Sequence, residues 1–175
     1  MPDLAGICFL ICDVDGVLTD GRIILDSSGV ETKAFHVRDG SGLKYWLRAG
    51  HQAALLSGRE SPAVDRRAAE LGLTLVEQGA KDKLPAFERL LKAAGCTADE
   101  AAFVGDDLPD LPVLRRAGFG VAVADAVAEF RSAADYTTQA RGGHGAVREV
   151  VELLLKAQGK WAGILERYRE KVGGS

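Results

Sequence analysis

Short apolar runs and amphipathic stretches alternate along the 175-residue chain. The apolar runs are nearly continuous, which is typical of strands buried on both faces of a parallel sheet. The stretches between them repeat apolar residues every three or four positions, as helices packed on one face do. The pattern predicts strands at residues 7–12, 51–56, 74–76, 101–104, 120–123 and 136–138, and helices at 41–49, 61–71, 83–94, 108–117, 127–133 and from 145 onwards. We therefore predict an α/β fold, a doubly wound and mostly parallel sheet, forming one domain over residues 1–175.

One segment near the N-terminus departs from this alternation. Residues 22–25 and 32–37 flank the turn-forming sequence Asp26-Ser27-Ser28-Gly29 and predict a β-hairpin, a flap of about residues 21–38. An isolated two-stranded hairpin is marginally stable in water, so we expect this one to pack against something. Another subunit is a reasonable candidate.

The C-terminal segment forms a second departure. Gly159 interrupts the pattern, and residues 160–171 predict a basic helix. We expect the apolar stripe of this helix to dock on the core of its own chain rather than on a neighbour's site. The stripe consists of Trp161, Ile164, Leu165 and Tyr168.

Charge and cysteine content narrow the class of protein. The net charge of −3 lacks the excess of basic residues that is typical of nucleic-acid-binding proteins. The apolar run at residues 4–12 is too short to span a membrane and has neither a basic region before it nor a signal cleavage site. Three cysteines, an odd number, argue against a disulfide framework. We expect a cytoplasmic protein that binds neither nucleic acid nor membrane.

Carboxylates follow two of the predicted strands. Asp13 and Asp15 end the first apolar run, and in a continuing strand they would face the same side and repel each other. Asp106, Asp107 and Asp110 follow the run at 101–104, and the two groups converge if the strands are parallel neighbours. Clustered carboxylates, with water and a substrate phosphate, are the usual ligands of Mg²⁺.

Two further stretches supply groups for an anion. Ser57-Gly58-Arg59 ends a third apolar run just before a helix whose start is marked by Ser61-Pro62. Backbone N–H groups and a hydroxyl at a helix N-terminus bind anions. Lys83 opens another helix, where its charge opposes the helix dipole, and a bound phosphate would remove that penalty.

The ordered motifs Asp-x-Asp-Gly, Ser-Gly-Arg, Lys and Gly-Asp-Asp-x-x-Asp resemble those of the haloacid dehalogenase superfamily of phosphatases, which have a Rossmann-like sheet. Further segments resemble the 3-deoxy-D-manno-octulosonate-8-phosphate phosphatases, which act in lipopolysaccharide biosynthesis, and their relatives that act on nonulosonate 9-phosphates. These segments are His36-Val37-Arg38-Asp39-Gly40, Gln78-Gly79 and residues 141–149. Spacing and charge do not separate the two substrates, but the tail sequence at 157–161 is more similar to the octulosonate group.

The chemistry that fits these residues, and that the resemblance implies, is phosphomonoester hydrolysis through an aspartyl phosphate. Asp13 would be the nucleophile and Asp15 the acid and then the base. Mg²⁺ would be held by Asp13, the backbone carbonyl of Asp15, and Asp106. Asp107 and Asp110 would not bind the ion directly but would orient waters or Lys83. The groups balancing the charge of the transferring phosphoryl would be Ser57, the Gly58 amide and Lys83.

Several residues keep two interpretations at this stage. Arg59 either binds substrate or pairs with a surface carboxylate. Asp20, Asp107 and Asp110, each taken alone, fit a turn-forming or capping role as well as a functional one. In the glycine-rich segment we favour binding of the substrate carboxylate, which the resemblance implies, over a flexible connection. The candidates there are Arg141, His144 and Arg148, of which Arg148 has the alternative role of a structural helix residue.

The motif spacing leaves little room for a cap domain. Only 43 residues separate Asp13 from Ser57, and 25 separate Ser57 from Lys83. We therefore predict an open site without a cap, and the resemblance implies a homotetramer in which a neighbour covers it. Two rival functions are a non-catalytic assembly module, like the domain appended to some cytidylyl-sialate synthetases, and a phospho-acceptor receiver domain. Asp15 argues against both, because it is an intact acid and base and would shorten the life of a phosphorylated receiver.

Overall fold

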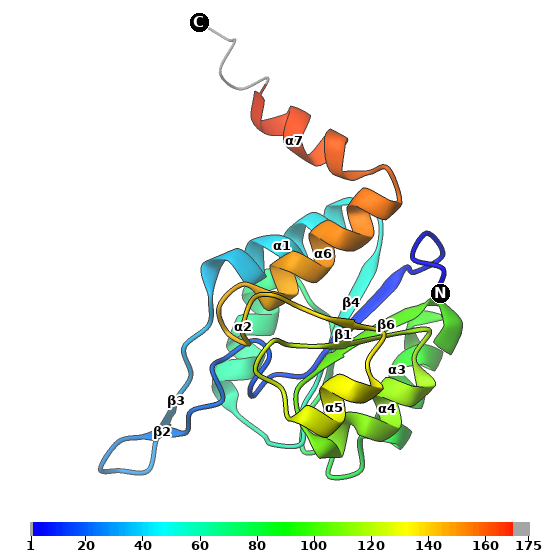
Figure 1. Cartoon of the computed structure of the whole chain (residues 1–175). Helices are drawn as coiled ribbons and strands as arrows, with labels where there is room; N and C mark the ends of the chain where they lie inside the picture. The colour runs from blue at the N-terminus through cyan, green and yellow to red at the C-terminus, as the bar shows by residue number, and fades with distance from the viewer. Residues whose placement is uncertain (1, 170–175) are drawn as a thin grey trace, which may run out of the picture.

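The computed structural model describes residues 2–169, and a six-stranded parallel sheet forms its centre (Figure 1). The strand order is β5-β4-β1-β6-β7-β8. The central strand β1 (Phe9–Cys12) is fully buried and pairs with β4 (Gln52–Leu56) on one side and β6 (Ala101–Gly105) on the other. The outer strands are β5 (Leu75–Glu77), β7 (Phe119–Ala122) and β8 (Tyr136–Thr137). The carboxyl ends of β4, β1 and β6 therefore lie side by side.

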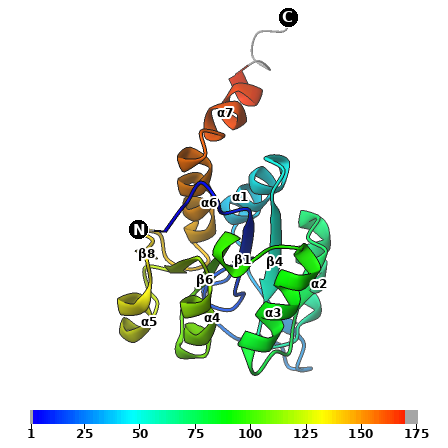
Figure 2. The same cartoon turned by 90° about the vertical axis from the view of Figure 1, so that its right-hand side faces the viewer.

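Helices cover both faces of the sheet (Figure 2). On one face α1 packs against α6, and on the other α3 packs against α4, which contacts α5. The helices are α1 (Val37–Arg48), α2 (Pro62–Leu71), α3 (Lys83–Ala94), α4 (Leu111–Arg116), α5 (Ala128–Ala133), α6 (Ala146–Ala157) and α7 (Trp161–Arg169), with short 3₁₀ turns at Ala98–Glu100 and Leu108–Asp110. None of the helices between residues 2 and 169 combines the length and apolarity needed to cross a membrane. The doubly wound parallel sheet predicted from the sequence is confirmed.

The start of α1 differs from the prediction. The helix begins at Val37 rather than at residue 41, so the second hairpin strand predicted at 32–37 is confined to Glu31–Thr32. The His36 ring accepts a hydrogen bond from the Arg38 backbone N–H at 3.2 Å and caps the helix four residues earlier than expected. Gly42, inside this helix, lies close to the backbone of α6. A Cβ atom on Gly42 would lie 3.0 Å from the Arg148 Cα of α6.

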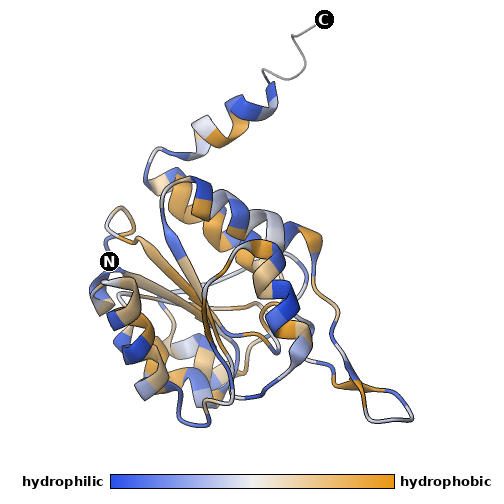
Figure 3. Ribbon diagram, turned by 180° about the vertical axis from the view of Figure 1, so that it is seen from behind, coloured by the Kyte–Doolittle hydropathy of each residue, from blue (hydrophilic) through white to orange (hydrophobic). Residues whose placement is uncertain are grey.

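The hairpin is present and extends away from the sheet (Figure 1). It consists of β2 (Ile24–Leu25) and β3 (Glu31–Thr32), which pair antiparallel. The Asp26 Oδ1 atom accepts hydrogen bonds from the Ser28 and Val30 backbone N–H groups and closes the turn. Apolar side chains on and beside the hairpin are exposed, at Ile23, Ile24, Leu25, Val30 and Val37. Figure 3 shows orange, hydrophobic stretches along the hairpin ribbon. Between Asp13 and Ser57 the chain forms this hairpin, α1 and β4, and between Ser57 and Lys83 it forms α2 and β5, so neither of these intervals contains a cap domain.

The terminal helix α7 lies against α1 through aromatic contacts. The Tyr45 ring is 6.1 Å from the Trp161 ring and 6.0 Å from the Tyr168 ring. No residue of α7 is buried, and Figure 1 shows the helix projecting beyond the body of the protein. The predicted helix ran to residue 171, and residues 170–171 lie outside the described part of the chain.

Candidate active site

Three neighbouring strands end at the same edge of the sheet, and each is followed at once by a candidate functional residue. Asp13 follows β1, Ser57 follows β4 and Asp106 follows β6. Because Cys12 is in register with Leu55 and Val104, these side chains emerge at nearly the same height. A hollow of about 240 Å³ opens there, lined by Asp13, Asp15, Ser57, Gly58, Arg59, Lys83, Asp106, Asp107, Pro109 and Asp110.

Lys83 connects two of the acids inside this hollow. It is the first residue of α3, its side chain is 7% exposed, and its Nζ atom donates to Asp13 Oδ1 at 2.7 Å and to Asp110 Oδ1 at 2.5 Å. Burial alone would lower the pKa of Lys83, but the Asp13 and Asp110 carboxylates raise it above its ordinary value. Lys83 therefore stays positively charged at neutral pH. Asp110 lies beside Lys83, one of the groups that the sequence analysis expected it to orient.

Three carboxylates crowd together at the same point. Asp13, Asp106 and Asp110 each have an oxygen within 4.8 Å of the others. Burial, followed by the charge of Asp110, raises the pKa of Asp13 to about 7. Burial, followed by the charge of Asp13, raises the pKa of Asp106 to about 8. One lysine offsets only part of this negative charge, so the donor set fits a divalent cation that prefers oxygen ligands.

The carboxylate of Asp15 lies apart from this cluster. It forms ion pairs with Lys33 and, at 3.8 Å, with Arg59. In a continuing strand Asp15 would face the same side as Asp13, but the three carboxylates that meet are Asp13, Asp106 and Asp110. The side chain of Asp15 is 23% exposed and faces the open part of the hollow. Asp107 is also exposed, and its Oδ1 atom accepts from the Leu108 backbone N–H at 2.8 Å.

Two glycines allow the loops of the site to approach each other. Gly16 has φ +92°, and a Cβ atom there would lie 2.1 Å from Asp106 Oδ2. A Cβ atom on Gly142 would lie 1.7 Å from the Gly16 carbonyl oxygen. The Gly143 backbone N–H also donates to the Val17 carbonyl at 2.8 Å. The glycine-rich segment is therefore the support on which the Asp13–Asp15 loop rests.

The predicted binders of the substrate carboxylate do not reach this hollow. Arg141 is exposed and pairs with Asp125 at 3.4 Å. His144 bonds to the Gly142 carbonyl through Nδ1 at 2.8 Å and lines a separate hollow of about 430 Å³ with Arg38 and Arg148.

Arg148, for which two roles remained open, has structural contacts. Its Nε atom donates to Glu152 at 2.8 Å, and its guanidinium lies 4.7 Å from the centre of the Tyr45 ring. The contact with Tyr45 joins α6 to α1, whereas the pair with Glu152 lies within α6. The substrate role of Arg141 and His144 stays a prediction.

Sequence analysis missed Lys33, which the hairpin brings to the edge of the site. Its side chain is 2% exposed and pairs with Asp15 and, at 3.5 Å, with Glu31. Arg59 in turn donates to Glu31 at 2.6 Å. The available signal was the spacing of Glu31 and Lys33, which are two residues apart and therefore face the same side of an extended segment.

Comparison with known proteins places this site in a family. Residues 75–150 match the model of haloacid dehalogenase-like hydrolases. The chain is 47% identical over 157 residues to the 3-deoxy-D-manno-octulosonate 8-phosphate phosphatase of Haemophilus influenzae, covering 90% of this chain and 87% of that protein. The phosphatase of the same name from Escherichia coli strain B is 48% identical, over 91% of this chain and 85% of that protein.

A solved structure agrees with these sequence matches. The 3-deoxy-D-manno-octulosonate 8-phosphate phosphatase of Moraxella catarrhalis superposes with a TM-score of 0.92 at 46% identity, and 95% of each chain is covered. Both the overall sequence and the fold therefore agree with one group of enzymes. The chain belongs to the 3-deoxy-D-manno-octulosonate 8-phosphate phosphatase family of haloacid dehalogenase-like hydrolases.

Proposed function

We propose that this protein hydrolyses 3-deoxy-D-manno-octulosonate 8-phosphate to the free sugar acid and phosphate, a step in lipopolysaccharide biosynthesis. The observation that carries the proposal is the contact of Lys83 with Asp13 and Asp110 at the sheet edge, beside Asp106. The relatives that carry this name are 47–48% identical over most of the chain. The structure of the Moraxella enzyme contains a magnesium ion, a phosphate ion and a KDO molecule.

In the proposed reaction Asp13 is the nucleophile. One of its oxygens forms a bond to phosphorus while the bond from phosphorus to the sugar oxygen breaks, giving an aspartyl phosphate and the sugar alcohol. Asp15 donates a proton to the departing oxygen and later takes one from the water that hydrolyses the aspartyl phosphate. Lys83, Ser57 and the Gly58 amide surround the position of the phosphoryl oxygens and stabilise their charge.

The carboxylate cluster fits Mg²⁺. Asp13 and Asp106 would be side-chain ligands, with the Asp15 backbone carbonyl as a further one. Asp110 would hold Lys83 in place rather than bind the ion directly, because its Oδ1 atom accepts from Lys83 at 2.5 Å and its Oδ2 atom accepts from the Asp106 backbone N–H at 3.2 Å. When bound, the ion supplies charge neutralisation that lets Asp13 approach a phosphate dianion.

The discriminating measurement is phosphate release from the eight-carbon substrate and from a nonulosonate 9-phosphate, with Mg²⁺ and with a chelator. We expect Mg²⁺-dependent turnover and a kcat/KM at least about tenfold higher for the eight-carbon substrate. Glucose 6-phosphate, which lacks the carboxylate, is the control for recognition of a sugar acid. A preference for the nine-carbon substrate would keep the chemistry and change the substrate. No turnover of either compound would favour the non-catalytic assembly module.

We also propose that the chain works as one phosphatase domain and assembles as a homotetramer in the cytoplasm. The exposed apolar residues of the hairpin support association, since Ile23, Leu25 and Val30 are each 58–60% exposed. We expect light scattering to give the mass of four chains, and I24E/L25E to give a smaller species. A wild-type protein that is monomeric and fully active would contradict the assembly.

A further inference from the structure

A closed ring of alternating charges lies beside the hollow. Lys33 pairs with Asp15 and lies 3.5 Å from Glu31, Glu31 accepts from Arg59 at 2.6 Å, and Arg59 Nε lies 3.8 Å from Asp15 Oδ2. The four residues come from three parts of the chain. Asp15 follows β1, Arg59 follows β4, and Glu31 and Lys33 belong to the hairpin segment. The ring therefore links the position of the hairpin to the side chain of Asp15.

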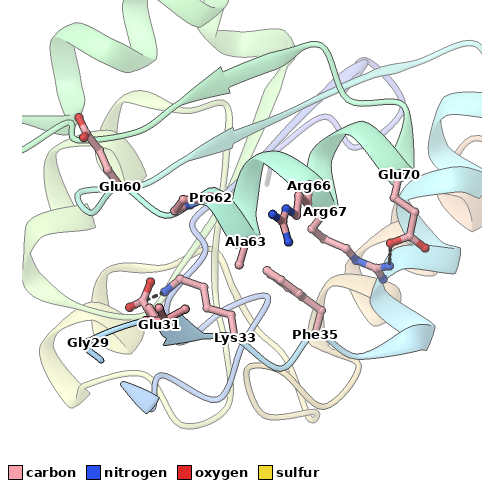
Figure 4. A pocket seen from close by; sticks show the side chains of 11 residues that line it. Gly29, Glu31, Lys33, Phe35, Glu60, Pro62, Ala63, Arg66, Arg67 and Glu70 are labelled. Carbon is pink, nitrogen blue, oxygen red and sulfur yellow. Dashed lines mark hydrogen bonds and ion pairs between the residues drawn. The ribbon is translucent and has the colours of Figure 1, made fainter. Parts of the chain in front are cut away.

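Lys33 is buried in a part of the chain that is otherwise exposed. Its side chain is 2% exposed, whereas both β2 residues and the neighbouring Thr32 and Ala34 are exposed. Figure 4 shows its amino group turned toward Glu31, at one end of a hollow of about 680 Å³ between the hairpin and α2. A lysine that only solubilised the hairpin would keep its ammonium group in water. The ammonium group of Lys33 is instead removed from water and pairs with the carboxylates of Asp15 and Glu31.

The two motif carboxylates are thus held by two different lysines. Lys83 holds Asp13 from α3, and Lys33 holds Asp15 from the hairpin. Lys33 contacts only the Oδ1 atom of Asp15. The Oδ2 atom makes no hydrogen bond within residues 2–169 and lies 3.8 Å from the Nε atom of Arg59, which lines the hollow together with Asp15.

Resting on the proposed phosphatase activity, we propose that Lys33 is a positioning residue for departure of the leaving group. It fixes Oδ1 of Asp15 so that Oδ2 is directed at the oxygen that bridges phosphorus and the sugar. In that step the Asp13–phosphorus bond forms, the bridging bond breaks, and the proton of Asp15 moves to the departing oxygen. Misplacing a catalytic group by about 1 Å can cost on the order of 10²-fold in rate, so loss of this restraint has a measurable effect.

The test uses substrates whose leaving groups differ in their need for a proton. An alkoxide is strongly basic and leaves only when protonated, whereas nitrophenolate leaves readily without a proton. We compare kcat/KM of wild type and Lys33→Met on the sugar-acid phosphate, phenyl phosphate and p-nitrophenyl phosphate. This parameter reports the steps up to leaving-group departure and is insensitive to hydrolysis of the aspartyl phosphate. Phenyl and p-nitrophenyl phosphate are nearly the same size, so their ratio isolates the proton requirement.

We expect the kcat/KM of Lys33→Met to fall at least about tenfold on the sugar-acid phosphate and on phenyl phosphate, and by less than about threefold on p-nitrophenyl phosphate. Lys33→Arg, which keeps the charge, should recover most of the loss. In an Asp15→Asn background, Lys33→Met should add nothing, because its effect passes through Asp15. Lys92→Met, at an exposed site on α3, is the matched control. Thermal unfolding checks each variant, and Lys33→Gln replaces Lys33→Met if the latter does not fold.

Equal losses on phenyl and p-nitrophenyl phosphate would overturn the proposal, since they would indicate a general structural role. An additive loss in the Asp15→Asn background would also overturn it, since Lys33 would then contact the substrate directly. If the wild-type protein hydrolyses none of the three phosphates, the proposed function itself fails. The two failures are therefore distinguishable.

Discussion

Asp13→Asn should lower phosphate release by about 10⁴-fold or more, because an amide is a very poor nucleophile toward phosphorus. The substitution keeps the shape of a side chain that is 7% exposed and lies 2.7 Å from Lys83 Nζ. It also removes one of three crowded carboxylates, so the variant should remain folded. The measurement is single-turnover phosphate release with enzyme in excess over the sugar-acid phosphate. Thermal unfolding of the same preparation tests whether the loss arises from the chemistry.

Direct evidence for the role of Asp13 would come from the covalent intermediate. Wild-type enzyme quenched in acid during turnover should carry a phosphoryl group on the peptide that contains Asp13, and Asp13→Asn should carry none. Asp99→Asn provides the matched control, since Asp99 is an exposed aspartate in the 3₁₀ turn before β6. A variant at position 13 that kept a tenth of the wild-type rate would eliminate Asp13 as the nucleophile. Phosphoryl label on a different peptide would do the same.

The part of the site that could be predicted from the sequence consists of residues placed by strand ends. Asp13, Ser57 and Asp106 each follow a buried apolar run, and in a parallel sheet the ends of neighbouring runs must meet at one edge. The expectation that the first strand and the strand at 101–104 are neighbours is confirmed, since Phe9 pairs with Ala101 and Cys12 with Val104.

The residues that were missed or misplaced depend on contacts distant in the chain. Lys33 reaches Asp15 because the chain that follows β3 returns to the sheet edge, and no periodicity in those few residues predicts that path. Arg141 lies outside the hollow because the neighbouring Gly142 packs directly on the Gly16 carbonyl, an arrangement that only the assembled loops define. The local pattern of apolar and polar residues therefore predicted the edge of the sheet where the site lies, but not the groups that surround the site.

The crowding of the carboxylates leads us to expect that Asp106 lowers the stability of the metal-free protein although it is needed for activity. The pKa values of Asp13 and Asp106 are raised to about 7 and about 8, whereas in the unfolded chain both would be near 4. The folded, metal-free protein therefore binds more protons than the unfolded chain between about pH 4 and pH 8. Its free energy of unfolding falls as pH rises through that window, because the ionised carboxylates are desolvated by burial, and also repel each other, only in the folded state.

Asp106→Asn should consequently stabilise the metal-free protein at pH 8 by roughly 1–3 kcal/mol, while abolishing Mg²⁺-dependent activity. The stabilisation should shrink toward pH 5, where the wild-type carboxylates become protonated. Mg²⁺ should reverse the order of stability, since it stabilises the wild type by binding only the folded state and the variant lacks a ligand. Urea unfolding at pH 5, 6, 7 and 8, with chelator and with Mg²⁺, measures all three effects.

The adjacent Asp107 provides the control for this experiment. It is exposed and caps the following turn by accepting from the Leu108 backbone N–H, a role that asparagine also performs well. Asp107→Asn should therefore leave the stability of the metal-free protein nearly unchanged at every pH and keep the gain from Mg²⁺. If Asp106→Asn were less stable than wild type at pH 8 in chelator, the ionised Asp106 carboxylate would not destabilise the folded, metal-free protein, and the prediction would be wrong. If Mg²⁺ stabilised Asp106→Asn as much as wild type, the ion would bind elsewhere, and the cluster of Asp13, Asp106 and Asp110 would not be its site.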